Sequence, residues 1–187
     1  MNNPEDDLPI TRWLHAVEAG DESAKAPLFN AIYAHLRVLA KAQRRRWRGN
    51  ETMGTTALIN ELFLKLDVPR GFRTRSHFFA TASKAMRQIL VSYAQQQSAQ
   101  KRGGDQLHVS LDDVSLKSSM TATALLDLEA IVKELEDRDP RRSSIVECRV
   151  FGGMTLTETA EALDISPATV KREWRLAAAW LTAEGAL

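Results

Sequence analysis

The chain has 187 residues, of which 44% are hydrophobic and 26% charged, and its formal net charge is +1. This size fits one ordinary globular domain or two small ones, and the nearly neutral total does not by itself indicate a nucleic-acid partner. The single cysteine, Cys148, excludes an internal disulfide framework and favours a reducing compartment. Residues 1–11 are polar and acidic rather than a signal peptide, and no apolar run could span a bilayer, so we expect a soluble, cytoplasmic protein without a membrane partner.

The first 100 residues of the chain predict four helices. Helices are expected over residues 10–19, 24–47 and 55–67, because apolar residues recur there at helical spacing. Residues 69–76 form a basic loop, and a further helix is expected over 77–100. These four helices can enclose one core.

The charges are distributed unevenly along this part of the chain. No Asp or Glu occurs between Val68 and Gly104, whereas basic residues recur there. They are Arg70, Arg73, Arg75, Lys84, Arg87, Lys101 and Arg102. A second basic run precedes them at Arg37–Arg48, while acids gather near the N-terminus and at Glu134–Asp139. This segregation predicts a cationic surface that suits phosphates.

The chain divides after Gly103-Gly104. Residues 105–121 are polar, rich in Ser and Asp, and lack helical periodicity, which is typical of a linker. A second helical unit follows, and no strand pattern of period two persists anywhere. We therefore expect an all-α protein with two small helical domains at 1–102 and 122–187, joined by a flexible linker at 103–121.

Residues Thr155–Leu181 read as a helix-turn-helix. Thr155 and Glu158 form a capping box, and Asp164 tolerates the left-handed backbone of the turn. Ser166 caps a second helix with Pro167 at its first position. On that helix the buried stripe is Val170, Trp174, Ala177, Ala178 and Leu181, and the opposite face carries Ala168, Lys171, Arg172 and Arg175. An ordinary helical hairpin with a solvated basic face is the alternative interpretation.

The sequence contains no motif typical of a catalytic site. The four histidines are scattered without metal-ligand spacing, and Cys148 has no nearby histidine. Glycine pairs occur only as turn signals rather than as a phosphate-binding loop. We therefore expect neither an enzyme nor a bound cofactor or metal.

The segments Ala57–Leu66, Phe72–Gly104 and Asp139–Trp174, in this order along the chain, resemble three motifs of a bacterial RNA polymerase sigma factor of the extracytoplasmic-function (ECF) class. The segment Ala57–Leu66 resembles the polymerase-binding helix, and Phe72–Ala94 with Lys101–Gly104 resembles the segment that recognises and opens the minus-ten promoter element. The segment Asp139–Trp174 resembles the domain that reads the minus-thirty-five element. The resemblance covers nearly the whole chain.

The resemblance implies roles for particular residues. Minus-thirty-five recognition falls to Thr169, Lys171, Arg172 and Arg175 in the major groove. Capture and melting of the minus-ten element fall to Arg70, Arg73, Arg75, Lys84, Arg87 and Gln88. Core RNA polymerase is expected to bind Ala57, Asn60, Glu61 and Lys65. For Arg44–Arg48, a solvated helix end is about as good an interpretation as a contact with DNA or polymerase.

One departure from the family pattern concerns regulation. Typical members carry acidic residues at the start of the polymerase-binding helix, where this chain has Gly54, Thr55, Thr56 and Ala57. A phosphate on a threonine would restore negative charge at a helix N-terminus. ECF groups that lack these acids are linked to Ser/Thr kinases, so we expect phosphorylation of Thr56, or else of Thr55 or Thr52, by such a kinase. The competing interpretation is that Thr55 or Thr56 simply caps the helix.

A conventional helix-turn-helix regulator with a helical sensing or dimerisation domain is the alternative function. It would bind duplex operators without polymerase, whereas the sigma-factor interpretation requires core RNA polymerase and promoter DNA as partners. The acid-free stretch from Val68 to Gly104 favours the sigma factor, because a sensing domain needs no such surface. An anti-sigma factor is a further partner that the resemblance allows but does not require.

Overall fold

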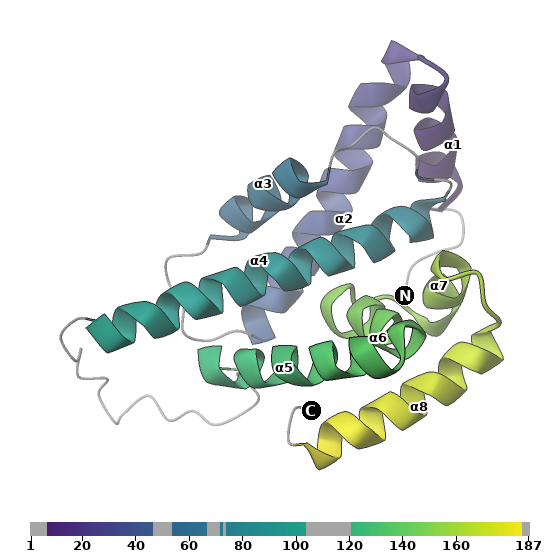
Figure 1. Ribbon diagram of the computed structural model, residues 1–187. Coiled ribbons are helices and arrows are strands. Elements are labelled where there is room, and N and C mark those ends of the chain that lie inside the picture. Colours follow the sequence, from purple (N-terminus) through teal and green to yellow (C-terminus); the bar gives the residue numbers. More distant parts are fainter. Residues whose placement is uncertain (1–6, 47–53, 67–71, 73, 104–120, 185–187) are drawn as a thin grey trace.

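The computed structural model describes residues 7–46, 54–66, 72, 74–103 and 121–184 (Figure 1). Within these ranges every regular element is a helix, which confirms the predicted all-α class. None of the helices in the described ranges is long and apolar enough to cross a membrane. The predicted linker lies almost wholly outside the described residues, so the division into two domains stays a prediction.

The N-terminal half consists of the helices before residue 104. They are α1 (Asp7–Glu18), the short 3-10 helix η2 (Glu22–Ala24), α2 (Lys25–Arg46), α3 (Thr55–Lys65) and α4 (Arg75–Gly103). α4 begins two residues before the predicted start, because Thr74 caps its first turn by accepting a hydrogen bond from the His77 backbone N–H at 3.1 Å. Arg75 therefore lies on the helix and not in the loop where the sequence placed it.

The C-terminal half consists of the helices after residue 121. They are α5 (Ala122–Arg138), α6 (Pro140–Val146), the π-helix η4 (Glu147–Phe151), α7 (Leu156–Ala162) and α8 (Pro167–Ala183). Side chains cap the starts of α5 and α6: Thr121 accepts from the Ala124 N–H, and Asp139 accepts from the Arg142 N–H. The sequence did not predict the π-helix, which continues α6 with a wider turn.

The predicted helix-turn-helix is confirmed in its local detail. Both hydrogen bonds of the capping box between Thr155 and Glu158 are present at the start of α7. Asp164 adopts a left-handed backbone with φ of 53°, and Ser166 caps α8, where Pro167 occupies the first turn. Local sequence alone determines this segment, since each signal acts over three or four residues.

α4 lies between the other N-terminal helices and the C-terminal half, where it packs on α5, η4 and α7 (Figure 1). The N-terminal helices share a core, and that hydrophobic cluster continues into the C-terminal half through residues such as Leu128, Val132 and Phe151. A buried polar contact joins the halves as well: the Gln43 side-chain amide donates to the backbone carbonyls of Val150 at 3.0 Å and Phe151 at 2.8 Å.

The two halves approach each other closely at Gly152, just after η4. A Cβ atom at this position would lie 1.9 Å from the Ser83 Oγ of α4 and 2.7 Å from the Cys148 carbonyl oxygen. Glycine is therefore required here by space rather than by its backbone angles, which are those of a right-handed helix. The neighbouring Gly153 differs, because its φ is +60° and a Cβ there would meet only Leu39 at 3.7 Å.

Gly152→Ala should lower the free energy of unfolding by about 2–3 kcal/mol, because overpacking forces α4 and η4 apart. Gly153→Ala is the matched control and should cost about 1–2 kcal/mol through backbone strain. In urea denaturation, Ser83→Ala should restore part of the stability lost in Gly152→Ala and none of that lost in Gly153→Ala. Equal behaviour of the two glycine variants toward Ser83→Ala would contradict the close packing.

Candidate nucleic-acid interface

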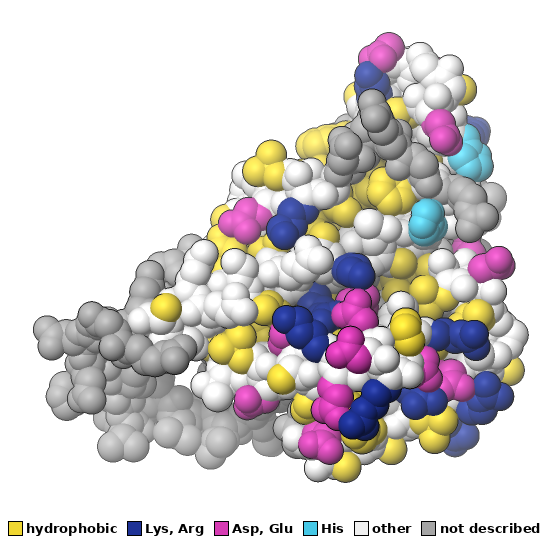
Figure 2. Space-filling view, in the orientation of Figure 1, with side chains coloured by type: hydrophobic (Ala, Val, Ile, Leu, Met, Phe, Trp, Pro, Cys, Tyr) yellow, Lys and Arg dark blue, Asp and Glu magenta, His cyan; other side chains and the backbone are white. Residues whose placement is uncertain are grey.

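The first half of α8 presents a basic face to solvent. Lys171, Arg172 and Arg175 are exposed, whereas Val170, Ala177 and Leu181 on the opposite face are fully buried. Figure 2 shows Lys and Arg side chains gathered over the beginning of this helix. Thr169 is half-buried at the helix start, where its backbone N–H donates to Ser166 Oγ at 3.1 Å. The predicted minus-thirty-five residues are thus brought together at one end of one helix.

Glu173 fixes the orientation of this basic face. One carboxylate oxygen accepts from Arg142 Nε at 3.1 Å and Nη2 at 2.7 Å, so that α8 is tied to α6. The other oxygen accepts from Arg172 Nε at 3.0 Å and Nη2 at 2.9 Å. The hydrogen bonds from Arg142 and then Arg172 lower the pKa of Glu173. The sequence analysis missed Glu173 because its partner on α6 lies 31 residues away.

The predicted minus-ten residues divide into two groups on α4. Lys84 and Gln88 are exposed, whereas Arg75 and Arg87 retain only 3% and 4% of their surface. Arg70 and Arg73 lie outside the described residues. The two buried arginines are not available to a nucleic acid in this conformation, because the C-terminal half covers them.

Arg87 is held by carboxylates from the C-terminal half. Its Nε and Nη2 donate to the two oxygens of Glu129 on α5, at 2.6 Å and 3.1 Å. Its Nη1 donates to Glu147 on η4 and lies 3.5 Å from Glu136. We refer to these four residues as the Arg87 cluster. Figure 2 shows acidic and basic side chains side by side where α4 meets α5.

Burial and pairing act in opposite directions within the Arg87 cluster. Burial alone would lower the pKa of Arg87, but the hydrogen bonds and charges of Glu129 and Glu147 outweigh it and raise this pKa. Burial raises the pKa of Glu147, which the Arg87 guanidinium only partly offsets. The guanidinium therefore stays charged, and it can remain buried only while its carboxylates are beside it.

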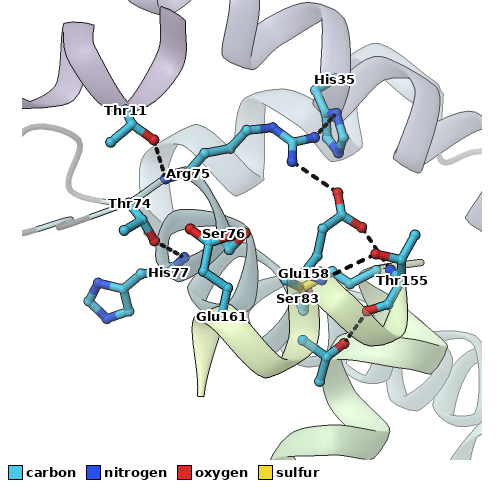
Figure 3. A network of polar contacts seen from close by, with 12 residues as sticks. Thr11, His35, Thr74, Arg75, Ser76, His77, Ser83, Thr155, Glu158 and Glu161 are labelled. Carbon is cyan, nitrogen blue, oxygen red and sulfur yellow. Dashed lines mark hydrogen bonds and ion pairs between the residues drawn. The ribbon is translucent and has the colours of Figure 1, made fainter. Parts of the chain in front are cut away.

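Arg75 forms a second cluster at the start of α4, which is drawn in Figure 3. Its Nη1 donates to Glu158 of α7 at 2.9 Å, and its Nη2 lies 3.2 Å from Nδ1 of His35 on α2. The next residue, Ser76, donates from Oγ to Glu161 of α7 at 2.8 Å. We refer to Arg75, His35 and Glu158 as the Arg75 cluster. It ties α7 of the helix-turn-helix to the N-terminal half.

His35 is neutral in the Arg75 cluster. Burial first, and the charge of Arg75 second, lower the pKa of His35 to about 4, against a smaller opposing effect of Glu158. Since an arginine only donates, the Nδ1 atom beside Arg75 must be the acceptor, which requires an unprotonated ring. Glu158 is ionised: burial would raise the pKa of Glu158, but the Thr155 backbone N–H and the Arg75 guanidinium together lower it.

The predicted polymerase-binding residues lie on two sides of α3. Ala57 and Asn60 are exposed, and Leu64 on the same side is 86% exposed. Glu61 accepts a hydrogen bond from Tyr93 Oη, and Lys65 donates to Gln88 at 3.3 Å, so both side chains face α4. The sequence analysis missed Leu64, although its position outside the buried stripe of α3 was a usable signal.

The start of α3 has no side-chain cap. Gly54 occupies the N-cap position without a side-chain hydrogen bond, and the first turn contains no acidic residue. Thr55 is half-buried and Thr56 is exposed. Neither threonine therefore serves as the N-cap, so the competing interpretation, in which Thr55 or Thr56 caps the helix, is wrong. Thr52 lies outside the described residues.

The free energy of unfolding should fall by about 2 kcal/mol between pH 7 and pH 5, because His35 binds a proton in the unfolded chain below its ordinary pKa of 6.5 but not in the folded protein above about 4. His35→Gln keeps an acceptor for Arg75 and should flatten this dependence in urea denaturation. His15→Gln, at an exposed position of α1, is the control and should leave it unchanged. An unchanged slope in His35→Gln would contradict the assignment.

Comparison with known proteins agrees with this geometry. The family model described as ECF sigma factor matches residues 8–186. No curated protein and no solved structure gives a significant match to the chain. Among the described residues no group of side chains could hold a metal ion. A match over nearly the whole chain, together with a capped helix-turn-helix that exposes a basic face, places this protein in the ECF sigma factor family, whose members act in transcription initiation with core RNA polymerase and promoter DNA.

Proposed function

We propose that this sigma factor contacts its promoter through two helices, α8 and α4, whose basic side chains differ in their exposure to solvent. α8 reads the minus-thirty-five element through Lys171, Arg172 and Arg175, with Thr169 positioning the helix start. α4 and the basic segment before it hold the separated minus-ten strand through Arg70, Arg73, Arg75, Lys84, Arg87 and Gln88. The exposed basic face of α8, fixed by Glu173 against α6, is the observation that carries the proposal.

The exposed side of α3 is the proposed contact for core polymerase. Ala57, Asn60 and Leu64 are one or two turns apart and face solvent. A leucine that is 86% exposed on a helix is expected to pack on a partner. Glu61 and Lys65 support this contact indirectly, since their bonds to Tyr93 and Gln88 fix α3 on α4.

Run-off transcription with core polymerase tests the function. Lys171→Ala/Arg175→Ala should reduce promoter-specific transcripts by about 10–100-fold, because each major-groove contact is worth about 1–3 kcal/mol. Lys25→Ala/Arg138→Ala removes the same charge from exposed positions on α2 and α5 and is the matched control. Equal losses in the two variants would contradict a role for α8 in reading the promoter.

A conventional helix-turn-helix regulator would give the opposite result in the same assay. It would bind a duplex operator tightly without polymerase and would give no run-off product when core polymerase is added. No observation on the described residues favours it, since the family match extends over α1 to α4 as well as the helix-turn-helix.

We further propose that a Ser/Thr kinase activates this protein by phosphorylating Thr56. The residue is exposed, and the helix end beside it has backbone N–H groups that no side chain caps and no acid in its first turn. A phosphate there would add up to about two negative charges where the helix dipole favours them. Thr55 is the second candidate and is half-buried; Thr52 is the third.

Thr56→Glu should bind core polymerase more tightly than the unmodified wild type, by about 5-fold or more, since a carboxylate at a helix N-terminus supplies part of the charge of a phosphate. Thr56→Ala should bind as the unmodified wild type does and should gain nothing from incubation with the cognate kinase. Fluorescence anisotropy with labelled protein measures both. Tight, kinase-independent binding by unmodified wild type would exclude the switch, and activation of Thr56→Ala would move the site to Thr55 or Thr52.

A further inference from the structure

The buried arginines of α4 are paired with carboxylates that lie far away in the sequence. Arg75 and Arg87 are almost completely buried, and no Asp or Glu lies between Val68 and Gly104 to pair with them. Their carboxylate partners come from the C-terminal half. Glu129, Glu136 and Glu147 face Arg87, and Glu158 faces Arg75. Lys84 is also 3.6 Å from Glu136, and Ser76 donates to Glu161.

These carboxylates occupy the guanidinium donors that the phosphates of a nucleic acid would use. A guanidinium offers donors in a fixed fork, and the bidentate contact of Arg87 with Glu129 uses the same donors as a bidentate contact with a phosphate. Arg75 uses one donor of its fork, Nη1, for the Glu158 carboxylate. Each arginine can therefore hold the C-terminal half or a nucleic acid, but not both at once.

Contacts without charge reinforce the same arrangement. Gln43 on α2 donates to two carbonyls of η4, and the close approach of Gly152 to Ser83 brings η4 against α4. The shared hydrophobic cluster would lose burial if the halves separated. The basic face of α8, by contrast, remains exposed while Arg75 and Arg87 of α4 are covered. The packing thus closes one of the two DNA-contacting helices selectively.

We infer that the acidic face of the C-terminal half, formed by Glu129, Glu136, Glu147, Glu158 and Glu161, is an intramolecular occupant of α4 that competes with single-stranded nucleic acid. The free protein is then closed at α4, and strand binding requires the C-terminal half to move away. The inference rests on the proposed function only in taking α4 as the surface for the separated strand.

Removal of carboxylates from the Arg87 cluster should open α4. Glu129→Gln/Glu147→Gln leaves a buried guanidinium without its main partners and keeps the side-chain volumes. Because the apparent dissociation constant scales inversely with the open fraction, binding of a short fluorescein-labelled single-stranded DNA of mixed sequence should tighten by about 10-fold or more. Glu134→Gln/Asp137→Asn removes the same charge from exposed positions of α5 and should tighten binding far less.

A second variant tests the same opening without altering charge. Gln43→Ala removes the polar contact between α2 and η4 and should also tighten binding of the single strand. Cys148 lies on η4, which packs on α4, and is 2% exposed, so the rate at which its thiol reacts with a disulfide reagent reports opening around η4 in the full chain. That rate should rise in Glu129→Gln/Glu147→Gln and in Gln43→Ala, and it should stay at the wild-type value in the control.

Different measurements test the closure of α4 and the proposed function. Faster thiol reaction with unchanged affinity for the single strand would overturn the inference, and so would an unchanged thiol rate in both folded variants. Circular dichroism establishes folding, and Gln43→Ala remains as the test if the double variant does not fold. The proposed function fails separately, if wild type with core polymerase gives no run-off product from any promoter.

Discussion

The structure depends on a charged guanidinium buried between two halves of the chain. Arg87 on α4 is 4% exposed, and burial of such a group is tolerated only with carboxylates in contact. Because no Asp or Glu lies between Val68 and Gly104, the carboxylates of Glu129 and Glu147 must come from elsewhere in the sequence. Loss of one partner of such a buried pair costs about 3–5 kcal/mol, so this requirement holds α5 and η4 against α4.

The two helices that we propose contact the promoter consequently differ in the free protein. α8 carries its basic side chains on the surface, oriented by Glu173, and it can meet a duplex without rearrangement. α4 must first lose its carboxylate partners. In the function that we propose, α8 reaches the upstream promoter element first, and polymerase binding at α3 then makes Arg75 and Arg87 of α4 available to the separated strand. Control at Thr56 would act on that event rather than on either DNA contact.

The sequence predicts much of the local structure and little of the packing. The capping box at Thr155, the turn at Asp164 and the cap at Ser166 follow from residues three or four apart, and all are present. The same holds for the exposed face of α8. The burial of Arg75 and Arg87 could not be predicted, because their carboxylate partners lie 42 to 83 residues away and a basic stretch suits carboxylates as well as phosphates. The π-helix η4 carries no comparable local signal.

The separation of the two halves is the most direct test of this account. Spin labels at the exposed positions Thr81 on α4 and Lys133 on α5, in a chain with Cys148→Ala, report it by pulsed electron paramagnetic resonance. The account predicts one narrow, short distance in the free protein and a longer distance in the complex with core polymerase and promoter DNA. The same short distance in both states would contradict it, because α4 would then remain covered while the promoter is open.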